Sequence, residues 1–389
     1  MFMLTVILII QCEKDEPQVI FKDNNFLNAL IERGIDTNGD SSINSAEAEA
    51  VDYLNVSYCE ITFMNGIELF VNLVYLDCSN NRIARINVSN NTKLNYIDCS
   101  KNRIYTLDVS NNTVLKVLEC SENRLSTLDV SNNVMLIKID CDENQLVDLS
   151  ITNCTALEEL HCYHNNLTSL DVSALVELKY LDCNVNKLSE LNTTNNISLE
   201  LLICSNNPIT SLDLSNNPTL KYLACGSFLS SLDISNNTIL ERLMCPGNQL
   251  TKLDVTNNPF LEYLHCGNNY LLLLDVSKNS ELTDLYCDFN PLNNIDVANN
   301  VKLKNLSCRA NDLETLDVTN NISLKSLVCS SNQLTQLDVS LNKELILLWI
   351  EDMPTLKEVC VWALPFPPEN FQLKSNNSPN VYFTTNCSE

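Results

Sequence analysis

The residue types that carry out chemistry are unevenly represented in this chain of 389 residues. It has 18 cysteines and 49 acidic residues, but only six glycines and three histidines, and its net charge is −25. The glycines are too scattered to form a phosphate-binding loop, no GxSxG motif is present, and the histidines form no HExxH motif. A strongly acidic chain also repels nucleic acid. These features favour a non-catalytic protein that does not bind nucleic acid.

The segment Asp36–Glu47, DTNGDSSINSAE, concentrates oxygen donors at regular positions. It resembles the calcium loop of EF-hand and dockerin-like modules, although Ser41 stands where EF-hands prefer glycine. The resemblance implies a helix-loop-helix over residues 23–53 and a single, weak structural Ca²⁺ site. An acidic turn without metal is the alternative. The implied ligands are Asp36, Asn38, Asp40, Ser42 through its backbone carbonyl, Asn44 and Glu47.

Thirteen of the cysteines follow one period. Each lies 21 residues after the last, apart from a single step of 20 residues between Cys225 and Cys245. A fixed period of this length is typical of a solenoid. We call these thirteen residues the lattice cysteines. They are Cys78, Cys99, Cys120, Cys141, Cys162, Cys183, Cys204, Cys225, Cys245, Cys266, Cys287, Cys308 and Cys329.

The repeat around these cysteines reads L-x-x-L-x-C-x-x-N-x-L. It resembles the leucine-rich repeat, with cysteine in place of the third leucine, over residues 51–361. Within that family it looks like the bacterial class with a 21-residue repeat, distantly internalin-like. The resemblance implies a mainly β, right-handed leucine-rich-repeat solenoid of about 14 coils with few helices. Because strand residues alternate faces, the cysteines should point inward as a packing column rather than form disulfides or bind metal.

The same pattern divides the chain into segments. Two columns of asparagine follow the leucines, and their amides can bond the backbone of neighbouring coils. The coil CGSFL, Cys225 to Leu229, lacks this asparagine and should be the weakest point of the stack. We expect a signal peptide over 1–11, a linker over 12–22, the helix-loop-helix, a capping coil over 51–72, repeats over 73–350 and a C-terminal cap over 351–389.

Three cysteines outside the lattice predict covalent modification, namely lipidation and a disulfide bond. The apolar residues 1–11 resemble the core of a signal peptide ending at a lipoprotein cysteine, Cys12. We therefore expect a secreted, outer-membrane or cell-surface lipoprotein lipidated at Cys12, with an ordinary secretory signal as the alternative. Cys360 and Cys387 flank the C-terminal tail, and we predict a disulfide between them, with two free thiols as the alternative.

The outward positions of the predicted first strand form the natural ligand surface. The residue before each lattice cysteine is mostly acidic in the first half of the chain and mostly apolar or aromatic in the second. Exposed aromatic residues and arginine on a rigid surface are typical of recognition sites, although they can also merely shield neighbouring strands. The predicted partner-binding patch consists of Tyr180, Ile203, Tyr222, Arg242, Met244, Tyr263, His265 and Tyr286.

A column of aspartates marks the second half of each repeat. Like charges on neighbouring coils repel, so these residues are solvated, collect cations or, as we favour, accept hydrogen bonds from the following turn. The column comprises Asp108, Asp129, Asp171, Asp213, Asp233, Asp254, Asp275, Asp296, Asp317 and Asp338.

Together these patterns predict a non-catalytic cell-surface protein that binds a protein or polysaccharide ligand through its first-strand face. We expect a monomer that meets the membrane only through a lipid anchor. One alternative is a structural or adhesive rod stiffened by calcium. Another is a polysaccharide-processing enzyme that uses paired carboxylates.

Overall fold

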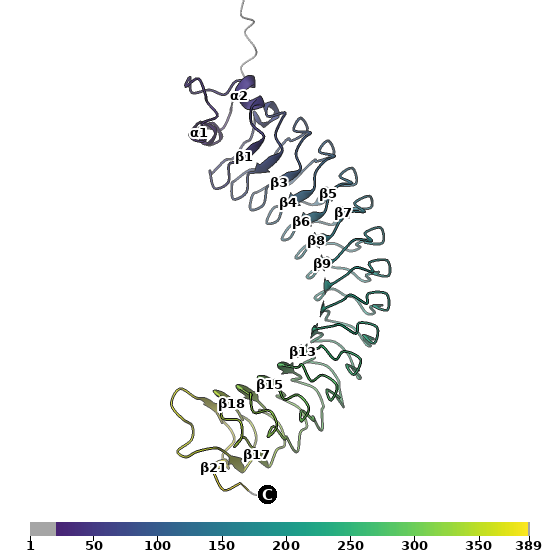
Figure 1. Ribbon diagram of the computed structural model, residues 1–389, viewed down its shortest axis with the longest axis vertical. Helices are drawn as coiled ribbons and strands as arrows, with labels where there is room; N and C mark the ends of the chain where they lie inside the picture. The colour runs from purple at the N-terminus through teal and green to yellow at the C-terminus, as the bar shows by residue number, and fades with distance from the viewer. Residues whose placement is uncertain (1–20, 388–389) are drawn as a thin grey trace, which may run out of the picture.

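A computed structural model describes residues 21–387, in which the chain winds into an arc with a sixteen-stranded parallel sheet along its concave side (Figure 1). Residues 1–20, including the predicted signal peptide and Cys12, lie outside the described residues. The sheet consists, in order, of β1 Tyr53–Asn55, β2 Tyr75–Asp77, β3 Tyr96–Asp98, β4 Val117–Glu119, β6 Lys138–Asp140, β8 Glu159–His161, β9 Tyr180–Asp182, β10 Leu201–Ile203, β11 Tyr222–Ala224, β12 Arg242–Met244, β13 Tyr263–His265, β14 Asp284–Tyr286, β15 Asn305–Ser307, β16 Ser326–Val328, β18 Leu347–Trp349 and β20 Gln372–Lys374.

The second halves of the coils are extended, but only a few pair as strands. These are β5 Thr127–Asp129 with β7 Asp148–Ser150, and β17 Gln336–Asp338 with β19 Glu358–Cys360 and β21 Tyr382–Thr384. The helical elements of the described residues are α1 Asn24–Glu32, α2 Ser45–Glu49 and the 3₁₀ turn η1 Ile67–Leu69. The mainly β solenoid with few helices is thus confirmed.

The sheet has sixteen strands, whereas the sequence predicted about 14 coils. The difference arises at the ends, where β1 precedes the first lattice cysteine and β20 follows the last. Strand pairing uses backbone groups, so a coil that has lost the cysteine still adds a strand. Leu347 of β18 pairs with Gln372 of β20 across an insertion that the 21-residue period does not contain.

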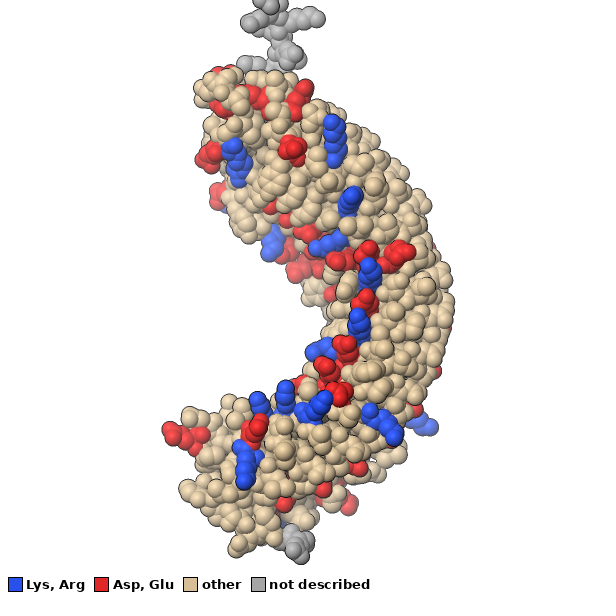
Figure 2. Space-filling model, in the orientation of Figure 1, with Lys and Arg blue, Asp and Glu red and all other residues tan. Residues whose placement is uncertain are grey.

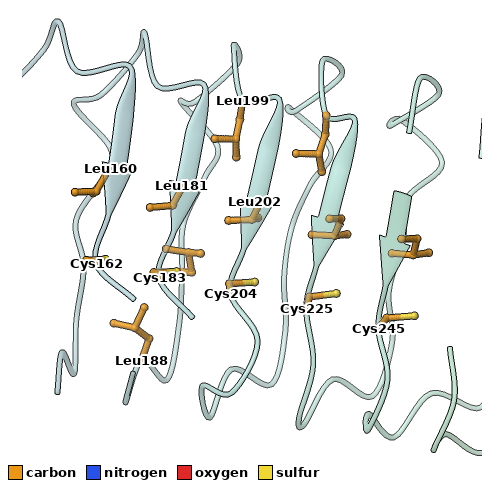
Figure 3. Packing of buried hydrophobic residues seen from close by; sticks show 14 of the residues in the cluster. Leu160, Cys162, Leu181, Cys183, Leu188, Leu199, Leu202, Cys204, Cys225 and Cys245 are labelled. Carbon is orange, nitrogen blue, oxygen red and sulfur yellow. The ribbon is translucent and has the colours of Figure 1, made fainter. Parts of the chain in front are cut away.

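The thirteen lattice cysteines form a buried row beside the leucines of the sheet. Figure 3 shows the leucines and cysteines of successive coils aligned in parallel rows. The cysteines are unpaired, and burial raises the pKa of their thiols, to about 12 at Cys204 and Cys329. The thiols therefore stay protonated at neutral pH and pack as small apolar groups, as the sequence predicted.

The first asparagine column bonds neighbouring coils together. The Asn102 Nδ2 donates to the carbonyl oxygens of Cys78, Cys99 and Ser100 at 3.0–3.1 Å, and its Oδ1 accepts from the Ile83 N–H at 2.9 Å. One side chain thus satisfies backbone groups of two coils where the chain turns away from the sheet. In the first coil Cys59 takes the asparagine position, and its thiol donates only to the Ser57 carbonyl.

The short coil after Cys225 interrupts this column. Its turn contains no asparagine, so no side chain from it reaches back to the N–H of Ile209, whereas Asn207 bonds the equivalent Leu188 N–H in the coil before. Gly226 is required there, because a Cβ atom would lie 2.6 Å from the Pro246 carbonyl oxygen. The strands themselves stay in register, with Tyr222 opposite Arg242.

In the second asparagine column the amide nitrogen is hydrogen-bonded, but in most members the amide oxygen is not. The Asn279 Nδ2 donates to the carbonyl oxygens of Val255 and Asn258, but its Oδ1 is buried without a hydrogen-bond partner. Asn217 differs, because its Oδ1 accepts from the Thr193 hydroxyl at 3.0 Å. Thr193 lies 24 residues earlier, at the position that valine holds before Asn279. The other unpartnered amide oxygens of this column belong to Asn91, Asn112, Asn133, Asn196, Asn237, Asn258, Asn300, Asn321 and Asn342.

We predict that Val255→Thr costs less stability than the same exchange at Val339. The new hydroxyl can donate to the Asn279 Oδ1, and such a hydrogen bond contributes about 1 kcal/mol. It offsets the cost of burying a hydroxyl group in place of a methyl group. Val339 is equally buried in the same column, but the residue 24 positions after it is Ala363.

Urea unfolding of both variants measures this difference. The free energy of unfolding should be about 1 kcal/mol higher for Val255→Thr than for Val339→Thr. Equal losses would contradict the prediction and would mean that buried water already serves the asparagine oxygens.

Candidate binding surface

Two columns of side chains point outward from the concave sheet. In a typical strand the middle residue is buried and the two residues beside it are half-buried. Because the strands pair in register about 4.8 Å apart, equivalent residues stack along the arc. The first column contains Tyr180, Leu201, Tyr222, Arg242 and Tyr263, and the second contains Ile203, Ala224, Met244, His265 and Tyr286.

Six of the eight predicted patch residues contact one another. The Arg242 guanidinium lies 4.5 Å from the ring centroid of Tyr263 and 5.8 Å from that of Tyr222. The Tyr222 hydroxyl lies 3.1 Å from the Met244 sulfur. The cluster therefore begins with an arginine stacked between two tyrosines, an arrangement that stabilises the cation by cation–π interaction.

The cluster continues on β13 and β14. The ring centroid of Tyr286 lies 5.5 Å from that of Tyr263 and 5.8 Å from that of His265. Burial lowers the pKa of His265, although Asp288 opposes the shift, and burial raises the pKa of Tyr263 and Tyr286. At neutral pH these three rings are uncharged, and Arg242 carries the positive charge of the cluster.

The remaining two predicted residues lie at the edge of this cluster. Tyr180 of β9 is separated from Tyr222 by Leu201, and Ile203 of β10 is separated from Met244 by Ala224. Leu201 and Ala224 were not predicted, although they fill the same columns. The patch is continuous across β9 to β14, with its polar contacts concentrated between β11 and β14.

The first half of the concave face carries an aromatic stack that the sequence analysis missed. The ring centroids of Tyr53, Tyr75 and Tyr96 are 4.4 Å apart in parallel, stacked pairs. Beside them runs the acidic column that begins with Asp77 and Asp98. Tyr75 and Tyr96 lie two positions before these aspartates, and that spacing was the signal available in the sequence.

Half-buried carboxylates lie in this acidic column at Asp98 and Asp182, and beside it at Asp142, which follows Cys141. Burial raises the pKa of Asp98 and Asp182, and it raises the pKa of Asp142 to about 7. The neighbouring charge of Asp140 adds to the effect at Asp142, whereas the hydrogen bond from the Tyr163 N–H opposes it. This part of the face thus changes its charge near neutral pH.

The aspartate column of the second halves accepts hydrogen bonds from the following turns. The Asp213 Oδ1 accepts from the Ser215 N–H at 3.0 Å, and all ten members make the equivalent bond two residues on. This is the Asx-type capping that the sequence analysis favoured. The hydrogen bonds from Ser215 lower the pKa of Asp213, so this carboxylate remains ionised at neutral pH.

The segment predicted to bind calcium is closed by hydrogen bonds between its own side chains and backbone. Asp36 accepts from the N–H groups of Gly39 and Ser41 at 2.7 and 2.9 Å, and both donors have positive φ angles, 76° and 64°. Ser41 therefore adopts the left-handed conformation that glycine favours. Asn38 and Asp40 each accept from the N–H two residues on, at 2.8 Å.

Glu47 faces the loop backbone. Its oxygens accept from the N–H groups of Thr37 and Asn44 at 2.8 and 3.0 Å, and Asn44 caps α2 by accepting from the Glu47 N–H. The bond from Asn44 is the main cause of the lowered pKa of Glu47. The oxygen donors suit Ca²⁺, but binding requires Glu47 to exchange these backbone bonds for the metal.

At the other end of the arc, Cys360 of β19 is bonded to Cys387, with Cα atoms 5.4 Å apart. The two sulfurs lie within 4.8 Å of an Asp338 oxygen, but thiols joined in a disulfide are not available as metal ligands. A groove of about 590 Å³ runs past this disulfide between Asp296 and Glu358, away from the concave patch. Its aspartates Asp296 and Asp317 belong to the capping column.

Solved structures place the chain among known proteins. The functional domain of InlJ from Listeria monocytogenes, described as including a cysteine ladder, is 32% identical with a TM-score of 0.83, over 91% of this chain and 80% of that one. A leucine-rich-repeat protein from Leptospira interrogans is 22% identical with a TM-score of 0.67, over 85% and 97% of the two chains. YopM from Yersinia enterocolitica is 23% identical with a TM-score of 0.65, over 94% and 84%.

The chain therefore belongs to the leucine-rich-repeat family. It has an internalin-like fold with a cysteine ladder, as in InlJ. A scan of protein-family models and a search of curated proteins found no match. Among residues 21–387, no helix has the length and apolar character needed to cross a membrane.

We predict that Asp142 gives the protein a pH-dependent stability. Its pKa of about 7 exceeds that of an unfolded aspartate, about 3.9, so the folded state binds more protons between these values. The contribution of Asp142 to stability is therefore fully present below about pH 4 and is lost as the pH rises through about 7. Asp142→Asn, which keeps an acceptor for the Tyr163 N–H, removes this loss.

Unfolding free energies at about pH 5 and about pH 8 test this prediction. The wild type should lose more stability than Asp142→Asn over this interval. Asp213→Asn serves as the control, because the pKa of Asp213 is lowered and both folded and unfolded forms are ionised there. Equal pH dependence in wild type and Asp142→Asn would contradict the prediction.

Proposed function

We propose that this protein is a non-catalytic binding protein whose ligand, a protein or a polysaccharide, docks on the concave sheet between β9 and β14. The observation that carries this proposal is the Arg242 cluster. The guanidinium of Arg242 stacks on Tyr222 and Tyr263, and it has no carboxylate partner among the described residues. Its N–H groups thus remain available to an acceptor on a ligand.

The arrangement of the scaffold supports recognition rather than mere shielding of neighbouring strands. Every patch residue is on a strand that is bonded on both sides, so the side chains are held in place before a ligand arrives. Such preorganisation reduces the entropy lost on binding. Aromatic and arginine side chains also contribute most of the binding energy in typical interfaces.

The carboxylates of the second halves support a non-catalytic role. A glycosidase needs two carboxylates placed across a substrate bond, one of them kept protonated. The aspartates of the second halves instead recur along the coils, and each accepts an N–H of its own turn. Their lowered pKa values suit a structural acceptor and do not suit a general acid.

The loop Asp36–Glu47 forms the second part of the proposal, as a single calcium site near the N-terminal end of the solenoid. Asp36, Asn38, Asp40, Ser42, Asn44 and Glu47 would hold the ion, which supplies a structural cross-link. The turn already has the backbone conformation of a tight oxygen-donor loop at Gly39 and Ser41. Calcium would stiffen the junction between α2 and β1.

The concave patch is tested by a triple substitution. We predict that replacing Tyr222, Met244 and Tyr263 with serine abolishes binding to partners identified on glycan and protein arrays, because it removes both rings that stack on Arg242. The matched control replaces Tyr270, Leu272 and Leu273 with serine; these side chains are exposed outside the strands, in the coil that also contains Tyr263. Unchanged array binding by the patch variant would overturn this function and favour a structural or adhesive rod.

The calcium site is tested by titration calorimetry on the full chain. We predict saturable Ca²⁺ binding with a Kd of about 0.1–1 mM, because single extracellular sites are weak. Asp36→Ala should abolish the heat of binding, whereas Glu49→Ala, an exposed acid just outside the loop, should leave it unchanged. Absence of heat with wild type, or equal heat with Asp36→Ala, would remove this part of the proposal.

A further inference from the structure

One column of charged residues lies directly before the strands, at the rim of the concave sheet. Consecutive members are stacked by backbone bonds, such as that from the Lys179 N–H to the Glu158 carbonyl oxygen at 2.9 Å. Where opposite charges alternate, the column pairs with itself: Lys179 bonds Glu158 at 2.8 Å, and Lys221 bonds Glu200 at 2.9 Å. Acidic and basic side chains alternate along the middle of the arc in Figure 2.

The alternation fails in the next five coils. The column there reads Glu241, Glu262, Thr283, Lys304 and Lys325, and each residue after Glu241 is bonded to the one before through the backbone at 2.8 Å. Two acids are therefore direct neighbours, and so are two lysines. The four charged side chains form no ion pair within residues 21–387. Like charges one strand apart destabilise the free protein.

This order is self-complementary about Thr283. A two-fold axis through Thr283, lying across the column, places Glu262 of one copy opposite Lys304 of the other. The same axis places Glu241 opposite Lys325. Because the operation is symmetric, each interface then contains four opposite-charge pairs and no like-charge pair.

Apolar side chains beside the column obey the same symmetry. The turns that precede these strands expose Phe260 by 55% and Val301 by 51%. The axis brings Phe260 opposite the aliphatic stem of Lys302, and it brings Val301 opposite Pro259. Exposed apolar side chains surrounded by charged groups are typical of protein interfaces.

We propose that two copies of this chain associate in antiparallel orientation through this rim, with the two-fold axis at Thr283. The proposal departs from the monomer expected from the sequence, because the column becomes visible only when the coils are stacked. It is independent of the ligand patch, whose side chains point from the strands themselves. Charge complementarity singles out a second copy, because only a partner with the opposite charge order fits, and the chain itself provides that order.

Sedimentation velocity of the full chain as a function of concentration tests the association. The wild type should form dimers at concentrations up to about 100 µM, and added salt should weaken them. Lys304→Glu with Lys325→Glu should weaken the dimer by about 100-fold or more, since four attractive pairs become repulsive. Glu241→Lys with Glu262→Lys should have the same effect.

Combining these variants makes the test specific to the two-fold arrangement. A mixture of the two double variants should form a heterodimer, because an all-acidic rim then faces an all-basic rim. The quadruple variant, in which both pairs are exchanged, should recover the wild-type dimer. The control exchanges Glu158 and Lys179, which pair within the chain, and should leave the dimer unchanged.

Three results would overturn the proposal. The first is a wild type that remains monomeric at all these concentrations. The second is a dimer that survives both double substitutions, and the third is a mixture or quadruple variant that fails to restore association. A partner of different sequence that binds the wild-type rim while the chain stays monomeric would show that the rim serves another ligand.

Discussion

The hydrogen bonds of the buried asparagine amides are the interaction on which the rest of the structure depends. Each strand has only three residues, so the sheet alone provides few bonds per coil. The Asn102 amide adds bonds to the carbonyls of Cys78 and Cys99 and to the N–H of Ile83. Because one side chain connects two consecutive coils, the spacing between coils is nearly constant, and the leucine and cysteine rows can pack without gaps.

The constant spacing between coils also determines how outward-facing side chains are arranged on the surface. Every outward position is repeated about 4.8 Å away on the next coil, so a single residue type in the repeat becomes a column. The repulsion between stacked acidic side chains is offset differently in different columns. Asp213 and its equivalents accept backbone N–H groups of the following turn, whereas Glu158 and Glu200 pair with lysines. The same register brings Arg242 between two tyrosines.

The sequence predicts the fold well because the fold depends on local residues that recur with one period. The cysteine row, the capping aspartates and the patch around Arg242 all follow from position within the repeat. Of the stacked tyrosines, Tyr75 and Tyr96 lie within the cysteine lattice and could have been predicted from it, whereas Tyr53 could not, because its coil lacks the cysteine. The coil count was low for the same reason. The orientation of Glu47 could not be predicted either, because backbone donors and a metal ion compete for the same oxygens.

The one coil that is a residue shorter than the others lies next to the aromatic and arginine residues of the concave patch. The short coil begins at Cys225, directly after β11, and its strand contributes Tyr222 to the patch. Loss of one residue shortened the turn behind the sheet and removed its asparagine, yet the pairing of Tyr222 with Arg242 was kept. A shortened turn without its asparagine does not make a solenoid stiffer, so stiffness alone does not account for it. Departures from local regularity are expected at functional sites, and this one supports recognition on the concave face rather than a uniform rod.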